Sequence, residues 1–137
     1  MDVTVYLPDD IRQKAKDHGI VLSRFLRDAL NTEFARLEAI ERALGGAKEV
    51  LLKLEDENGR PYRGRFTATR IGESEEREVY LTDEETVIVY EPDQRRYSVV
   101  QDAETELREW LPEDTSYIAA MNALGIMPTV DLIFGDR

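Results

Sequence analysis

The sequence of 137 residues contains no cysteine, a single histidine and no long uninterrupted apolar run. The absence of cysteine excludes disulfides and thiolate chemistry. No apolar stretch approaches the roughly 20 residues that a membrane-spanning helix requires. The first residues also lack the basic-then-apolar order of a secretory signal. These absences predict a cytoplasmic protein with no membrane association.

Residue patterns that carry enzymatic chemistry are also lacking. The sequence shows no glycine-rich phosphate loop, no paired histidines and no serine, histidine and aspartate set at a recognisable spacing. The single histidine, His18, falls at the end of a predicted helix, where capping or packing is the simpler interpretation. The acidic runs 73–78 and 83–85 resemble metal ligands but are more typical of solvated loops. We expect no catalytic residue, no metal and no cofactor.

The formal net charge of −11 is unevenly distributed along the chain. Residues 1–45 hold 7 basic and 8 acidic side chains, whereas residues 46–137 hold 11 and 21. An acidic total argues against nucleic-acid binding, because proteins that bind nucleic acids are usually basic. Charge at the contact surface matters more than the sum, however, so the nearly neutral first part remains a candidate.

The first 45 residues predict one short strand followed by two helices. Val3, Val5 and Leu7 alternate with polar neighbours, as in a strand with one buried face. Pro8 ends this strand, and a helix is expected over residues 9–18 before Gly19. Since no other strand occurs in this part of the chain, the same strand of a second copy is the simplest partner for its backbone.

A second helix is expected from residue 21 or 22 to residue 44, followed by two glycines. One side of it carries a wide apolar stripe, which predicts a face buried against another protein surface. The expected length of roughly 35 Å is too great for the short preceding helix to cover. A second subunit is therefore the expected cover, with a dimer core formed by Val3, Val5, Leu7, Phe25, Leu26 and Leu30.

After the two glycines the apolar period changes from that of a helix to that of strands. Strands are expected at 50–54, 62–71, 77–81, 86–90 and 95–100, with an Asn58-Gly59 hairpin turn after the first. Helices are expected at 103–110 and 113–124, and residues 130–134 could add a last strand. Trp110 is expected to pack on the sheet. Arg63, Arg65 and Arg70 could form a basic stripe, although pairing with nearby acids is the simpler interpretation.

The segments 3–10 and 19–30 resemble the ribbon-helix-helix family of DNA-binding proteins, most closely antitoxins of the CcdA and VapB type. The resemblance covers about the first third of the chain. It implies a homodimer whose paired strands enter the major groove of double-stranded DNA. It further implies that outward strand residues read bases and that the start of the second helix binds phosphate. The implied base-reading residues are Asp2, Thr4 and Tyr6, and the implied phosphate-binding residues are Leu22, Ser23, Arg24 and Arg27.

Physical chemistry supports these implied roles, with two departures from the family pattern. Free N–H groups at a helix start bind phosphate, and a two-stranded ribbon fits the major groove, where base edges are distinguishable. Asp2 stands where a basic residue is common in the family, and Val21 replaces a frequent polar cap. An acid in the groove repels phosphate, although it can accept a hydrogen bond from cytosine.

The resulting prediction is an α+β protein with two domains. Residues 1–45 form a ribbon-helix-helix dimerisation and DNA-binding module, and residues 48–137 form an acidic, antiparallel β-rich domain with C-terminal helices. The predicted function is sequence-specific DNA binding by a prokaryotic transcriptional repressor. One alternative is an antitoxin that autoregulates its operon, and another is an interaction module that only dimerises. A toxin or a small-molecule effector is a candidate partner for the second domain.

Overall fold

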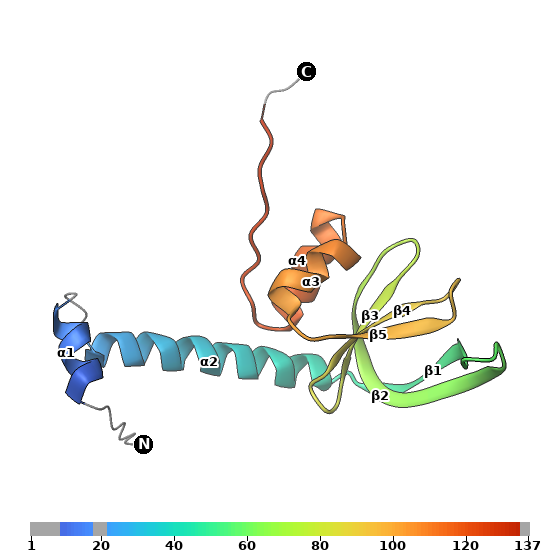
Figure 1. Cartoon of the computed structure of the whole chain (residues 1–137), viewed down its shortest axis with the longest axis horizontal. Coiled ribbons are helices and arrows are strands. Elements are labelled where there is room, and N and C mark those ends of the chain that lie inside the picture. The colour runs from blue at the N-terminus through green and yellow to red at the C-terminus, as the bar shows by residue number, and fades with distance from the viewer. Residues whose placement is uncertain (1–8, 18–21, 135–137) are drawn as a thin grey trace. The chain divides into compact units, whose positions relative to one another are not determined.

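A computed structural model describes residues 9–17 and 22–134, which form a mixed α and β protein (Figure 1). The helices are α1 (Asp9–Asp17), α2 (Leu22–Leu44), α3 (Ala103–Trp110) and α4 (Asp114–Ala123). The strands are β1 (Lys48–Glu55), β2 (Pro61–Glu73), β3 (Glu78–Thr82), β4 (Val87–Glu91) and β5 (Arg96–Val100). The expected α+β class with an antiparallel sheet and C-terminal helices is confirmed.

Contacts divide the chain into two units between Ala35 and Arg36, inside α2. In the first unit, α1 and the start of α2 lie where the apolar periodicity predicted two helices. The expected strand at residues 3–7 lies outside the described residues, as do His18 and Gly19. Helix α2 ends as predicted at the two glycines, where the Gly45 N–H donates to the Glu41 carbonyl over 3.0 Å.

The second unit is built on one five-stranded sheet in which each strand pairs with its sequence neighbours. The β1–β2 hairpin turns at residues 56–60, where the N–H of Asp56 donates to the Arg60 carbonyl. Gly59 adopts a φ of 77° in this turn, a conformation that favours glycine. The predicted Asn-Gly hairpin is therefore confirmed. Because strands that are consecutive in sequence are neighbours in the sheet, the sheet is an antiparallel meander joined by short turns.

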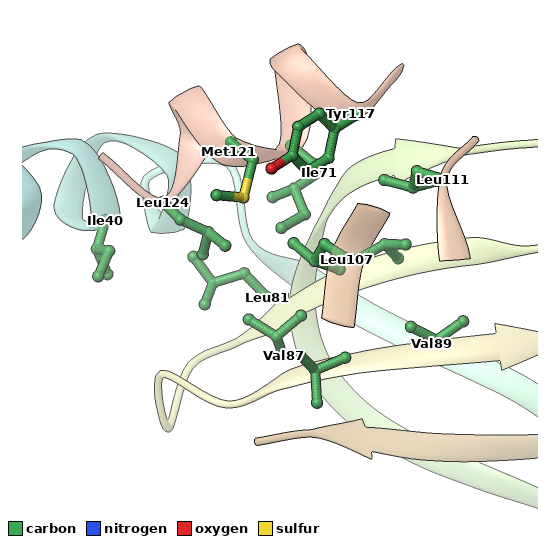
Figure 2. Close-up of a cluster of buried hydrophobic side chains, with 13 residues drawn as sticks. Ile40, Ile71, Leu81, Val87, Val89, Leu107, Leu111, Tyr117, Met121 and Leu124 are labelled. Atoms are coloured by element: carbon green, nitrogen blue, oxygen red, sulfur yellow. The ribbon is translucent and has the colours of Figure 1, made fainter. Parts of the chain in front are cut away.

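Alternation along the strands gives the sheet two apolar faces. One face packs against α3 and α4 and forms the larger core, shown in Figure 2. This helix-side core consists of Ile40, Ile71, Val79, Leu81, Val87, Val89, Val100, Leu107, Leu111, Tyr117, Ala120, Met121 and Leu124. Trp110 is partly buried against it. Because Tyr80, Ile88 and Tyr90 alternate with these core residues on β3 and β4, they lie on the opposite face.

The last two turns of α2 belong to the sheet unit. Ile40 is 6% exposed within the helix-side core, and the Thr69 hydroxyl donates to the Ala43 carbonyl over 2.7 Å. Gly125, at a φ of 72° after α4, approaches α2 so closely that an added Cβ would lie 2.5 Å from the Arg36 Cα. These contacts explain why the division falls before the end of α2.

The structure corrects one expected strand. Residues 130–134 form no strand and run without regular secondary structure after α4, as the trace in Figure 1 shows. Their alternating apolar pattern suits a strand, but a strand also needs a hydrogen-bonding neighbour. Only Val130 contacts the core, whereas Leu132, Ile133 and Phe134 are 73%, 89% and 81% exposed.

Candidate functional site

The first candidate site is the exposed face of α2 within residues 22–35. Phe25 and Phe34 are 59% and 52% exposed, and Leu26 and Leu30 between them are only half-buried. Leu26, Leu30 and Phe34 recur four positions apart along the helix. Phe25 directly precedes Leu26, so these residues form a wide apolar stripe with Phe25 and Phe34 at its opposite edges. Phe25, Leu26 and Leu30, predicted to form a dimer core, thus share one apolar surface that is incompletely covered within a single chain.

The predicted phosphate-binding residues gather at the start of the same helix. Ser23, Arg24 and Arg27 are exposed in its first two turns, and Leu22 is its first residue. No acidic side chain occurs in the first turn of α2. The first N–H groups of a helix lack partners within the helix, and the helix dipole favours an anion there. This end of α2 can therefore bind a phosphate group.

The remaining residues of the predicted DNA-binding surface and dimer core lie outside the described residues. They are the base-reading Asp2, Thr4 and Tyr6, together with Val3, Val5 and Leu7 of the expected dimer core. The structure accordingly places the predicted phosphate-binding residues and the predicted dimer-core residues of α2 on one helix. The strand expected at residues 3–7 is not among the described residues.

A second candidate site lies on the sheet face opposite α3 and α4. An apolar cleft of about 260 Å³ opens there between β1, β2 and β5, which we call the sheet cleft. Its lining is Leu52, Leu54, Tyr62, Gly64, Arg65, Phe66, Thr82, Ile88 and Tyr97. Tyr62 and Tyr97 are 48% and 50% exposed, whereas Leu52 and Leu54 are buried in the floor.

Gly64 shapes the floor of the sheet cleft because it leaves room for Leu54. A Cβ added at Gly64 would lie 2.8 Å from the Leu54 Cδ1. Gly64 pairs with Leu52 in the β1–β2 register, so the floor is made by residues that face each other across the hairpin. The absence of a side chain at Gly64 thus allows leucine side chains to fill the floor from β1.

The two outer strands approach each other at one end of the cleft. The N–H of Glu55, at the end of β1, donates to the Arg95 carbonyl over 3.1 Å, and the Arg95 guanidinium pairs with the Glu55 carboxylate at 3.0 Å. The Tyr90 hydroxyl donates to the Lys53 carbonyl over 2.8 Å. The sheet is thereby curved around the cleft and closed at this end.

Cations occur on the hairpin that carries the cleft although the second domain is acidic, but the side chains of Lys53, Arg63 and Arg65 alternate with the floor residues and belong to its other face. Lys53, Arg63 and Arg95 line a neighbouring hollow beside Leu54 and Tyr62. Among the residues that the structure describes, Lys53, Arg63 and Arg65 have no carboxylate partner. By contrast, Arg70 pairs with Glu73 and Glu78, as the simpler interpretation of these arginines expected.

At the other end of the same sheet face lies a more polar hollow of about 420 Å³, lined in part by Lys48, Arg70 and Tyr80. Burial, together with the nearby Glu78 carboxylate, raises the pKa of Tyr80 to about 12. Its ring meets that of Phe66 edge-on, with the centroids 5.6 Å apart. Tyr80 is therefore a neutral part of this wall in neutral solution.

Sequence reasoning did not identify the sheet cleft as a site. The available signal was the uninterrupted apolar run Val87-Ile88-Val89-Tyr90 on β4, because a strand that is apolar at consecutive positions is buried on both faces. The cleft also requires the curvature of β1 toward β5, which depends on contacts between distant residues.

No described helix is long and apolar enough to span a bilayer. Across residues 9–17 and 22–134, no group of three or more histidine, aspartate or glutamate side chains is placed to hold a metal ion. In comparisons with known proteins, no family model, curated protein or solved structure matches this chain.

Proposed function

We propose that this protein binds double-stranded DNA in a sequence-specific manner as a homodimer and acts as a prokaryotic transcriptional repressor in the cytoplasm. The observation that carries the proposal is the first half of α2. One helix there presents a wide apolar stripe, with the exposed Phe25 and Phe34 at its two edges, and a cationic start, with Arg24 and Arg27. This pairing fits a module that dimerises through one surface and binds phosphate with another.

The proposed dimer is that of a ribbon-helix-helix protein. The expected strand at residues 3–7 pairs with its copy, and the apolar side of α2 packs against the partner subunit. The paired strands present Asp2, Thr4 and Tyr6 to base edges in the major groove. The exposed Phe25 and Phe34, at the two edges of the apolar stripe of α2, support this arrangement, because their burial would remove a large apolar area from water.

The phosphate contacts in this proposal come from the start of α2. Ser23 and the N–H groups of the first turn hold one phosphate group, while Arg24 and Arg27 add charge on either side. The first 45 residues have a formal charge of only −1, so they repel DNA far less than the rest of the chain does.

The second domain favours the repressor over the antitoxin. Segments that neutralise toxins are typically disordered until bound. Here the sheet and helices enclose a core in which Val79, Val89 and Leu107 have no exposed surface. A folded domain of this kind is suited to sensing, oligomerisation or partner binding.

The proposal is tested by recovering genomic fragments on the purified full chain and measuring affinity for the enriched sequence by fluorescence anisotropy. Thr4→Ala should weaken binding to that sequence by about 1–3 kcal/mol and leave random DNA unaffected. Arg24→Ala should weaken binding to all sequences and reduce the salt slope by about 1.

Arg42→Ala is the matched control for Arg24→Ala. Arg42 is exposed on the same helix, 18 residues further along, which corresponds to roughly 27 Å. Its substitution should leave both affinity and salt slope unchanged. If no fragment is enriched, or if Arg24→Ala and Arg42→Ala behave alike, the proposed DNA surface is wrong.

A further inference from the structure

We propose that the sheet unit contacts phosphate groups of double-stranded DNA through Lys53, Arg63 and Arg65, which we call the basic patch. The inference rests on the proposed function and adds a second DNA contact to it, made by the acidic domain. The patch lies on the face of the β1–β2 hairpin opposite the sheet cleft, where alternation places the three side chains on one side of two paired strands.

The C-terminal helices leave this part of the hairpin uncovered. At the far end of β2, Ile71 is 7% exposed in the helix-side core, and a Cβ added at Gly72 would lie 3.0 Å from the Leu111 Cδ1. Arg65 and Arg63 precede Ile71 on the same strand by six and eight positions, and both are exposed. Figure 1 shows the turn end of the hairpin well away from α3 and α4. The patch is therefore accessible to a large partner.

The arrangement of charges in the patch is unfavourable for the hairpin itself. Lys53 and Arg63 face each other directly across the two strands, and Arg65 follows Arg63 on the same face. Like charges directly opposite one another destabilise an antiparallel pair. In the β4–β5 hairpin, by contrast, the facing residues Glu91 and Arg96 carry opposite charges and pair at 2.9 Å. A bound anion would offset the repulsion within the patch.

The acids of the hairpin do not neutralise the patch. Glu55 and Asp56 follow Lys53 along the chain, but they pair with Arg95 and Arg60 at 3.0 and 2.7 Å. Within residues 9–17 and 22–134, the three cations of the patch have no carboxylate partner. The patch thus keeps three positive charges available to a partner.

The composition of this face favours nucleic acid over an acidic protein as the partner. Interfaces with DNA are more polar and more positively charged than interfaces between proteins, whose cores are depleted of lysine and enriched in aromatic residues. Beside the patch, this face carries the exposed Leu51 and Thr67. Arginine binds phosphate through two parallel hydrogen bonds, and threonine hydroxyls also contact phosphate. Glu49 shares the face toward the start of β1, so the phosphate contacts belong nearer the turn.

The acidic remainder of the domain orients the patch toward DNA. Residues 46–137 hold 11 basic and 21 acidic side chains, so most of this surface repels a duplex. The local charge at a contact surface decides the approach of a charged partner more than the sum does. The domain can therefore approach DNA through the one hairpin face on which three positive charges lie together.

The test compares two double variants of the full chain that remove the same charge. Arg63→Ala with Arg65→Ala alters the patch, whereas Arg60→Ala with Arg96→Ala removes two exposed arginines that are ion-paired on the same sheet unit. Affinity for a duplex of random sequence is measured by fluorescence anisotropy over a salt series. Because both variants change the net charge equally, a difference between them reports contact rather than general repulsion.

We expect the patch variant to bind the duplex about tenfold more weakly at low salt and to reduce the salt slope by about 2, since each lost phosphate contact accounts for about 0.9. The control variant should keep the slope of the unaltered chain. Equal slopes and affinities in the two variants overturn the proposal.

A charge reversal separates a role in DNA binding from a role in stability. Arg63→Glu places an acid directly opposite Lys53, and opposite charges across two strands favour their pairing. The melting temperature of the full chain should therefore rise while its affinity for DNA falls. A fall in both quantities would show that Arg63 serves the fold and would overturn the proposal.

The proposed function and this inference can fail separately. If Arg24→Ala weakens DNA binding but the patch variant behaves like its control, the patch does not contact DNA and this inference alone is overturned. If the patch variant weakens binding but Arg24→Ala does not, the inference stands and the α2 surface is wrong. Polyglutamate binding that requires Arg63 and Arg65, together with DNA binding that does not, would assign the patch to an acidic protein and overturn the inference.

Discussion

The hydroxyl of Tyr90 on β4 donates a hydrogen bond of 2.8 Å to the backbone carbonyl of Lys53 on β1. These two strands are not neighbours in the sheet, whose order is β1-β2-β3-β4-β5. The bond therefore spans the face that carries the sheet cleft and holds β1 in its curved path.

Removing this bond should loosen the sheet. Tyr90→Phe deletes the hydroxyl and leaves the Lys53 carbonyl without that donor, so the free energy of unfolding should fall by about 1 kcal/mol. Urea denaturation of the full chain measures the change. The control is Tyr97→Phe, because the Tyr97 side chain is half exposed and its substitution should cost less than about 0.5 kcal/mol.

Tyr80 should make stability decrease at alkaline pH. Its pKa of about 12 in the folded chain lies above the ordinary value of 10, so folding favours the neutral hydroxyl. The resulting stabilisation is fully present below pH 10 and is lost as the pH rises from 10 to 12, because the unfolded chain ionises first. Tyr80→Phe should flatten this dependence in denaturation measured across that range, whereas Tyr97→Phe should not. An unchanged slope in Tyr80→Phe would assign the alkaline transition to another group.

The end of α2 should be required for the stability of the sheet unit. A chain of residues 36–137 retains Ile40 and the bond from Thr69 to the Ala43 carbonyl, whereas a chain of residues 48–137 loses both. We expect both to melt cooperatively, with the shorter chain less stable by about 2–5 kcal/mol, the cost of truncating a buried isoleucine. Calorimetry or denaturant titration gives this difference, and equal stability would show that α2 contributes nothing to the core.

The apolar side of α2 should hold the proposed dimer together. Leu30→Asp places a charge in the middle of that side and should shift the full chain toward monomer in sedimentation at micromolar concentration. Asn31→Asp introduces the same charge 100° around the helix, away from the stripe, and should leave the dimer intact. Dissociation by both substitutions, or by neither, would argue against this surface.

Most of the fold could be predicted from local sequence signals. The change of apolar period at the two glycines located the end of α2, and Asn58-Gly59 located the first hairpin. Helix α3 begins and ends where expected, at Ala103 and Trp110. Such features depend on residues close together in the chain, and sequence patterns record them directly.

The features that depend on distant residues could not be predicted in this way. Residues 130–134 carry a strand pattern, but a strand forms only beside a partner, and the pattern does not reveal whether a partner is present. The sheet cleft likewise requires Glu55 to meet Arg95 across 40 positions of sequence. The predicted α2 residues of the DNA site lie together because they share one helix, whereas Thr4 and Tyr6 lie outside the described residues.

Sedimentation of the full chain with an enriched DNA duplex tests the central claim most directly. The account predicts a dimer in the absence of DNA and a complex of two chains per binding site, which Leu30→Asp weakens and Asn31→Asp does not. A full chain that sediments as a folded monomer, or as a dimer that leaves every enriched duplex unbound at low salt, would contradict it.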